Sequence, residues 1–144
     1  MKHLTNLSVI AALAVAVTAP TSAFAFRAMN NLKVNPEGQF SFEVIQSGGI
    51  SAADVWCAAG DYAQRVLKVA QTQQVYLIEG KHMARTETRE RFGYSFSLTP
   101  PKEAANFTSK PLTLSLKNIG DSLSVSFARQ YCYNGLDDRM RIFP

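Results

Sequence analysis

The chain lacks an apolar run long enough to cross a bilayer. Its longest such run, Leu7 to Val17, falls well short of the roughly 18 residues that a spanning helix needs. A basic start at Lys2 precedes the run, and Ala23-Phe24-Ala25 supplies the small residues that a signal peptidase reads. No cysteine stands near that junction, which argues against a lipid anchor. The pattern predicts a signal peptide over residues 1–25, cleaved after Ala25, and export to the periplasm or beyond.

Cysteine and histidine are scarce, and they are widely spaced. The chain has two cysteines, Cys57 and Cys132, and beyond the leader it has one histidine, His82. The absence of a short Cys-x-x-Cys excludes covalent haem attachment and thioredoxin-like redox chemistry. Closely spaced ligand pairs of the kind that form a zinc site are absent too. The sequence therefore predicts neither a metal nor a cofactor.

The two cysteines are expected to pair after export. Thiols in an oxidising compartment form disulfides by default, and two cysteines allow one internal connectivity. A Cys57–Cys132 bridge would close a loop of 75 residues, for which chain entropy gives about 4 kcal/mol. Two alternatives stay open: two buried free thiols, or a reactive Cys57 with His82 as its base.

Charge of one sign is not concentrated in this chain. It has 15 Lys and Arg against 11 Asp and Glu, and loss of Lys2 with the leader lowers the net charge from +4 to about +3. This is far below a dedicated nucleic-acid binder, but it suits contact with anionic envelope components. Residues 26–144 are enough for a single domain, and no internal repeat is visible.

One strong helix is predicted after residue 50. Ser51 can cap its first turn and Asp54 completes a capping box. At 100° per residue the apolar side chains form one broad stripe, made of Ala52, Val55, Trp56, Ala59, Tyr62, Ala63, Val66, Leu67 and Ala70. Asp61, Gln64, Arg65 and Lys68 lie opposite, with Cys57 at the edge of that polar side. The pattern predicts that one flank meets the core and the other meets water.

The remaining segments alternate as strands do. After Phe26–Gly38, interpreted as a leading arm, the predicted strands are Phe40–Ile45, Val75–Glu79, Tyr94–Leu98, Leu112–Lys117 and Leu123–Phe127. Gly48-Gly49 ends the first strand, and Asn118–Asp121 suggests a hairpin between the last two. Residues from about 133 are expected to form a loose tail.

Serine and threonine alternate with large apolar residues along these strands, which is typical of an antiparallel sheet with one wet face. The predicted fold is therefore α+β in two layers, of order β-α-β-β-β-β, with one amphipathic helix on about five mostly antiparallel strands. A small barrel or sandwich plugged by the helix is the alternative.

Two stretches carry a resemblance. Trp56-Cys57-Ala58-Ala59-Gly60-Asp61-Tyr62-Ala63, with the later Gln130-Tyr131-Cys132, resembles small uncharacterised exported proteins of Gram-negative bacteria that have one such cysteine in each half. The resemblance implies a periplasmic or secreted setting and a paired Cys57 and Cys132. It implies no activity.

The segment Lys81–Arg91 is the one marked charge cluster. Its basic residues, Lys81, Arg85, Arg89 and Arg91, could form a contact surface for an anionic partner such as lipopolysaccharide or an acidic protein. The alternative is a solvated hairpin whose charges discourage edge-to-edge pairing of sheets.

Other candidates have plain structural explanations. Glu43, Asp61, Glu79 and Glu87 could supply the carboxylate pair of a glycan hydrolase, but nothing in the sequence pairs any two of them, and most are expected to be solvated. Trp56 and Tyr62 could line an aromatic ligand site, although aromatics on an apolar stripe usually fill the core.

Together these patterns predict an exported, disulfide-stabilised, non-catalytic binding or accessory protein of the periplasm or cell surface. Its partner would be an envelope component or a protein, not nucleic acid. The alternatives are a periplasmic hydrolase acting on envelope glycan or peptide, and a carrier with a small apolar site between helix and sheet.

Overall fold

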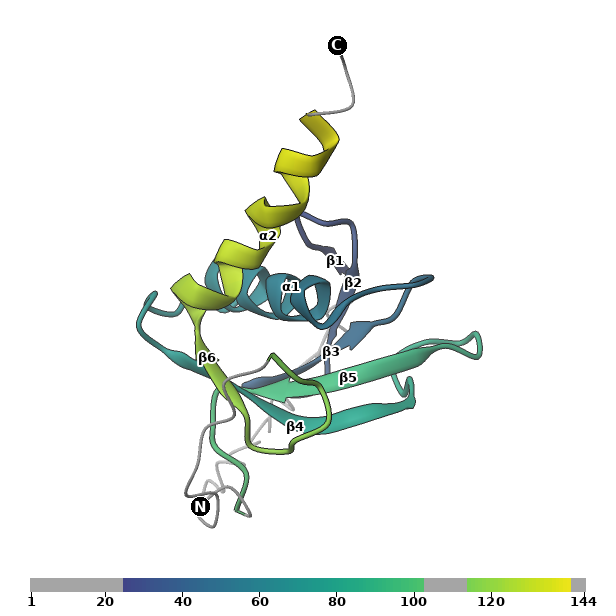
Figure 1. Ribbon diagram of the computed structural model, residues 1–144. Helices are drawn as coiled ribbons and strands as arrows, with labels where there is room; N and C mark the ends of the chain where they lie inside the picture. The colour runs from purple at the N-terminus through teal and green to yellow at the C-terminus, as the bar shows by residue number, and fades with distance from the viewer. Residues whose placement is uncertain (1–24, 103–113, 141–144) are drawn as a thin grey trace, which may run out of the picture.

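The computed structural model describes residues 25–102 and 114–140 (Figure 1). The chain folds as an α+β domain, as predicted, but with six strands and two helices. In chain order the elements are β1 (Phe26–Arg27), β2 (Lys33–Pro36), β3 (Ser41–Ile45), α1 (Ala52–Arg65), β4 (Gln74–Met83), β5 (Phe92–Ser97), β6 (Ser122–Ser124) and α2 (Val125–Met140). The predicted signal peptide lies outside the described residues, apart from Ala25.

The strands form one antiparallel sheet of order β1-β2-β3-β5-β4-β6. β3 and β5 occupy its centre, with Phe42 opposite Phe96 and Val44 opposite Tyr94. Residues 26–38, predicted to be an arm, instead supply β1 and β2. β2 pairs with β3 and β1 pairs with β2, both antiparallel. The sequence did not predict these two strands because they are too short to show an alternating pattern.

Helix α1 begins as the sequence predicts. The Ser51 hydroxyl accepts from the Asp54 amide, and the Asp54 carboxylate accepts from the Ser51 amide, which completes the capping box. The helix ends at Arg65, five residues before the end of the predicted stripe. Lys68 adopts a positive φ of 57°, a left-handed conformation that turns the chain toward β4.

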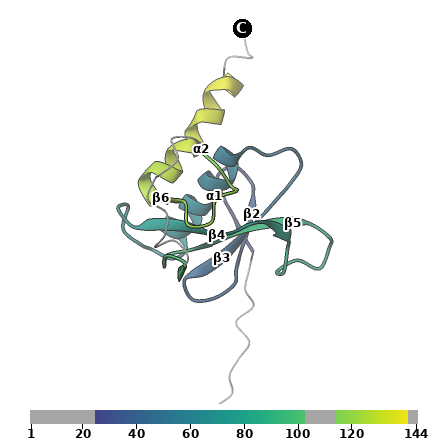
Figure 2. The same ribbon diagram turned by 60° about the horizontal axis from the view of Figure 1, so that its bottom comes forward.

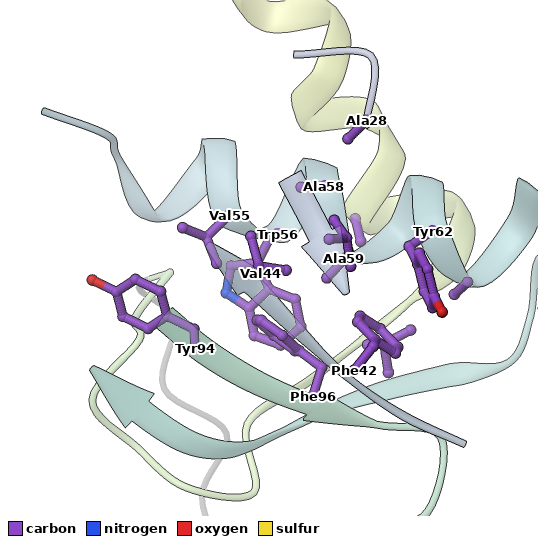
Figure 3. Packing of buried hydrophobic residues seen from close by; sticks show 14 of the residues in the cluster. Ala28, Phe42, Val44, Val55, Trp56, Ala58, Ala59, Tyr62, Tyr94 and Phe96 are labelled. Carbon is purple, nitrogen blue, oxygen red and sulfur yellow. The ribbon is translucent and has the colours of Figure 1, made fainter. Parts of the chain in front are cut away.

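The core lies between α1 and one face of the sheet (Figure 3). Trp56 and Phe96 meet edge to face at 5.0 Å, and Phe42 lies 4.6 Å from the ring of Tyr62. Trp56 and Tyr62 are therefore part of the core, as the simpler interpretation predicted. The indole of Trp56 also donates to the carbonyl of Ser115 at 3.2 Å, so its one polar group is satisfied.

A second helix replaces the last predicted strand. β6 pairs with β4 over only three residues, and the chain then turns into α2. Ser124 supplies the reason, since its hydroxyl accepts from the Phe127 amide in the way of a helix N-cap. The prediction of a strand over Leu123–Phe127 holds only as far as Ser124 and was wrong from Val125 on, because the alternation of Leu123, Val125 and Phe127 resembles a strand until the capping serine is considered.

Helix α2 crosses the side of α1 that was expected to face water (Figures 1 and 2). Val125, Ala128 and Cys132, spaced three and four apart, are buried against the rest of the domain. As a result Cys57 and Asp61, both on the predicted wet flank of α1, are fully buried. That part of the prediction was wrong, because the sequence of α1 does not show which element will pack against it.

The predicted strand Leu112–Lys117 is not found in the described residues. Positions 112 and 113 lie outside them, and residues 114–117 form no strand. The turn at Asn118–Asp121 exists, with Gly120 at a φ of 92°, but it leads into β6 rather than joining two paired strands. At the other end, the backbone of α2 remains helical to Met140. None of the described helices is long and apolar enough to span a membrane.

A buried carboxylate beneath the charged hairpin as candidate functional site

Glu43 occupies the centre of the sheet and is fully buried. Alternation along β3 directs Phe42 and Val44 into the core and Glu43 to the opposite face, which was predicted to be wet. The prediction of a solvated Glu43 was wrong because the segment after β4 folds over this face. A buried charge must be compensated by hydrogen bonds or by an opposite charge, so the groups that contact Glu43 show what its carboxylate holds in place.

Four donors surround the Glu43 carboxylate. Oε1 accepts from the backbone amide of Arg85 at 3.0 Å and from Nε2 of His82 at 2.8 Å. Oε2 accepts from the Thr86 amide at 3.0 Å and from the Thr86 hydroxyl. Burial raises the pKa of Glu43, but these hydrogen bonds from Thr86, Arg85 and His82 outweigh it, so the net pKa lies below its ordinary value.

His82 bridges two acceptors. Its Nδ1 lies 2.7 Å from the carbonyl oxygen of Gly80, and its Nε2 lies 2.8 Å from Glu43. A carbonyl and a carboxylate only accept, so the His82 ring lies between two acceptors and connects Glu43 to the backbone of β4.

Two irregularities in β4 make this cluster possible. Leu77 pairs with Phe96, Glu79 with Ser95 and His82 with Gly93, so β4 carries one extra residue in each interval. Glu79 and His82, three apart, would face opposite sides of a regular strand. The two register shifts bring both to the face that carries Glu43. Gly80, inside the strand, was the available sign of a bulge.

Gly93 makes room for the carboxylate. A Cβ at this position would lie 2.8 Å from Oε1 and 2.9 Å from Cγ of Glu43. These distances are too short for a real contact, so a side chain at Gly93 would displace Glu43 or the strand. In the sequence, Gly93 is only one of the small residues, with Ser95 and Ser97, that alternate with Tyr94, Phe96 and Leu98, so this role was not predicted.

Arg85 closes the cluster from outside. Its guanidinium pairs with Glu37 at 2.9 Å and Glu79 at 2.8 Å, and donates to the Ser95 hydroxyl at 3.0 Å. The hydrogen bond with Arg85 lowers the pKa of Glu79, and the acids around Arg85 raise its own pKa further.

A second set of contacts holds the next part of the segment. The Asn35 side-chain amide donates to the Thr86 hydroxyl at 2.8 Å and to the Glu87 carboxylate at 2.9 Å. Lys33 pairs with Glu87 and, with Asn35, lowers its pKa. Residues Arg85–Glu87 are thus attached to β2 and β3 by side chains that the sequence places some 40 to 50 positions earlier.

The cluster does not have the arrangement of a hydrolytic triad. Ser95 Oγ lies 3.4 Å from His82 Nε2, the same nitrogen that bonds Glu43. In a serine triad the acid and the hydroxyl use different ring nitrogens, so that the histidine can remove the serine proton. Here that nitrogen already donates to the carboxylate, and Ser95 has no free base.

Glu37, Glu43 and His82 place three possible ligand atoms within 4.8 Å of one another. Arg85 pairs with Glu37, and both oxygens of Glu43 already accept hydrogen bonds from the chain. The oxygens that a divalent ion would need are therefore already engaged, which disfavours an added cation.

The structure separates the four basic residues of the predicted contact surface. Arg85 is exposed but pairs with Glu37 and Glu79 at the outside of the Glu43 cluster. The ammonium of Lys81 lies 4.3 Å from the ring centre of Phe92, on the face of the hairpin opposite to the one that carries His82 and Glu79. Arg89 and Arg91 are exposed in the loop that joins β4 to β5. Within the described residues no ion pair involves Lys81, Arg89 or Arg91.

An apolar pair that the sequence analysis did not single out lies beside these cations. Met83 is directly opposite Phe92, and they are 51% and 44% exposed. By the register they lie on the same sheet face as Tyr94 and Phe96, but at the end of the hairpin, which extends past the helices (Figures 1 and 2). The apolar face of the sheet thus continues beyond the core without a cover from the described part of the chain.

The remaining candidates are structural. Asp61, expected at the surface, is buried in the contact between helices, where it accepts from the Met29 amide at 3.1 Å and from Arg65 at 3.0 Å. Arg129 of α2 lies 3.5 Å from its other oxygen. Cys57 is bonded to Cys132, as predicted, so it is not a free nucleophile.

Comparisons with protein-family models, with curated proteins and with solved structures found no match to this chain.

Proposed function

We propose that this protein is an exported, non-catalytic binding protein that uses the β4–β5 hairpin as its contact surface. The surface consists of Lys81, Met83, Arg89, Arg91 and Phe92, and is called the hairpin surface below. Arg85, included by the sequence analysis, serves instead to hold the loop.

One observation carries the proposal: a fully buried carboxylate is committed to the backbone of an exposed loop. Glu43 accepts the amides of both Arg85 and Thr86, the first residues of the segment that leads to Arg89 and Arg91. Fixing a loop in this way lowers the conformational entropy lost when a partner binds. A turn that served only for solubility would not need such an anchor.

The setting agrees with export. The Cys57–Cys132 disulfide is of the kind that persists outside the reducing cytoplasm. The resemblance to exported Gram-negative proteins points to the periplasm or cell surface. The hydrolase alternative gains no support from Ser95, His82 and Glu43, because their geometry leaves the serine without a base.

Site-specific photo-crosslinking in intact cells tests the proposal. A benzoylphenylalanine replacing Arg89 should trap envelope material, whereas the same group replacing Lys68, an exposed residue beyond the end of α1, should not. Identical adducts from both positions, or none from position 89, would contradict the hairpin surface. Amino-terminal sequencing of the purified protein checks cleavage after Ala25 in the same preparation.

A further inference from the structure

We propose that the partner of the hairpin surface is an anionic lipid bilayer, into whose interface Met83 and Phe92 insert. This inference rests on the proposed function and specifies its partner. It is drawn from exposed apolar groups at one projecting end of the domain, together with cations there that form no ion pair within residues 25–102 and 114–140.

The apolar part has the geometry of an insertion tip. Met83 and Phe92 form a cross-strand pair, so their side chains project from the same face and reach the same depth. Every backbone group near a bilayer needs a partner, and here Ala84 donates to Arg91 while Gln46 donates to Phe92. These two hydrogen bonds extend the backbone pairing past Met83 and Phe92, so the backbone beside the inserting pair is held in the sheet.

The charged part matches the headgroup layer. Lys81 covers the ring of Phe92 with its ammonium, as a cation does at the boundary between an apolar core and water. Arg89 and Arg91 lie in the connecting loop, where the exposed acid is Glu90. Arg85 and Glu87, by contrast, are neutralised by partners from other strands. The charge left at the tip is therefore positive and available to anionic lipids.

The rest of the structure favours a lipid over a protein partner. The β4–β5 hairpin that carries these residues extends past the helices (Figures 1 and 2). Stable protein interfaces use roughly 20–30 residues on each side, whereas the hairpin surface consists of five. Peripheral attachment to a membrane needs only a few inserted side chains and a few basic residues.

Sedimentation with vesicles tests the inference. The mature protein should bind vesicles of phosphatidylethanolamine with about 30% phosphatidylglycerol, and should bind phosphatidylcholine vesicles at least tenfold more weakly. Replacing Met83 and Phe92 with Ser together should weaken binding about tenfold or more. Replacing Lys81, Arg89 and Arg91 with Gln together should weaken it about a hundredfold at low salt.

Matched controls separate the hairpin surface from bulk properties. Phe40→Ser removes an equally exposed aromatic, 51%, next to the Ser41–Ser97 pair at the other end of the sheet. Gln at Lys68, Lys102 and Lys117 removes the same net charge from exposed positions elsewhere. Both controls should bind as the unmodified protein does. Equal losses in the controls and the hairpin variants would overturn the inference.

A local probe shows whether the tip enters the lipid. The emission of Phe92→Trp should shift to the blue on addition of anionic vesicles, while that of Phe40→Trp should not. The native Trp56 is buried and gives a constant background. No shift at position 92, or binding to soluble polyglutamate without vesicle binding, would overturn the lipid partner. If crosslinks from position 89 persisted in that case, the hairpin would remain a binding surface, and loss of both would remove the proposed function as well.

Discussion

At the scale of single residues, the buried Glu43 carboxylate is the most consequential group. Taking a carboxylate out of water costs several kcal/mol, and only well-placed donors offset this cost. Two backbone amides, a hydroxyl and the His82 ring supply them. The two amides belong to the loop, so the stability of the charge and the shape of the loop depend on each other.

Glu43→Gln should lower the free energy of unfolding by about 2–4 kcal/mol, because the amide nitrogen would face donors that the carboxylate now satisfies. Urea unfolding followed by circular dichroism measures the loss. Glu90→Gln, in the exposed part of the same loop, is the matched control and should change stability by less than about 0.5 kcal/mol. A Glu43→Gln variant as stable as the control would show that the carboxylate is not the anchor.

Acid should destabilise the protein. The pKa values of Glu43, Glu79 and Glu87 are lower in the folded state than the ordinary value of 4.5. Their contribution to stability is therefore complete above about pH 4.5 and is lost as the pH falls through the folded-state values. Burial raises the pKa of Asp121, which acts in the opposite direction. Between pH 7 and pH 3, the melting temperature should begin to fall once the pH drops below about 4.5.

The Glu43→Gln variant provides the control for this pH profile. Without the most buried of the three carboxylates, its melting temperature should fall less steeply over the same range. If the melting temperatures of the variant and of the unmodified protein fell equally steeply with pH, the acid sensitivity would come from groups other than Glu43.

At the scale of secondary-structure elements, the crossing of α1 and α2 determines how the domain closes. Gly60 permits it, since a Cβ there would lie 2.8 Å from the Cβ of Ala128 and 3.1 Å from the backbone nitrogen of Arg129. The disulfide joins the same two helices, and its Cα atoms are 4.9 Å apart. A small residue and a covalent bond therefore act together on the contact between these helices.

Gly60→Ala should destabilise the protein by about 1–3 kcal/mol, although alanine is the better helix former, because α2 must move away. Thermal unfolding of the oxidised protein tests this. Gly49→Ala, in the loop before α1, has open space around its Cβ and an ordinary φ, and should change the melting temperature little. A stabilised Gly60→Ala variant would mean that α2 does not approach α1 this closely.

At the scale of the whole molecule, the disulfide connects the two helices across 75 residues, and this segment contains the strands β4, β5 and β6. A closed loop of this length restricts the unfolded chain more than the folded one. The bridge also holds α2 over Asp61, so that its charge stays buried beside Arg129.

Removing the bridge with Cys57→Ala and Cys132→Ala together should lower the free energy of unfolding by about 4 kcal/mol, the entropy of the released loop. Urea unfolding of the double variant, compared with the oxidised protein, gives the value. A reductant should leave the free energy of unfolding of the double variant unchanged. It should lower that of the unmodified protein to about the value of the variant. If a reductant did not change the free energy of unfolding of the unmodified protein, the disulfide would not be a source of its stability.

The sequence by itself determined the features that depend on neighbouring residues. Ser51 and Asp54 announce the start of α1, and the alternation of Phe42, Val44, Tyr94 and Phe96 defines two central strands. The pairing of Cys57 with Cys132 followed from the number of cysteines and the expected compartment. The tertiary structure alone decided what covers each polar face: α2 covers Asp61, and the segment after β4 covers Glu43. These contacts join residues that are tens of positions apart, and the bulges that align Glu79 with His82 arise only when β4 pairs with β5. Local pattern records which side chains share a face, and it carries no information on which distant segment will pack on that face.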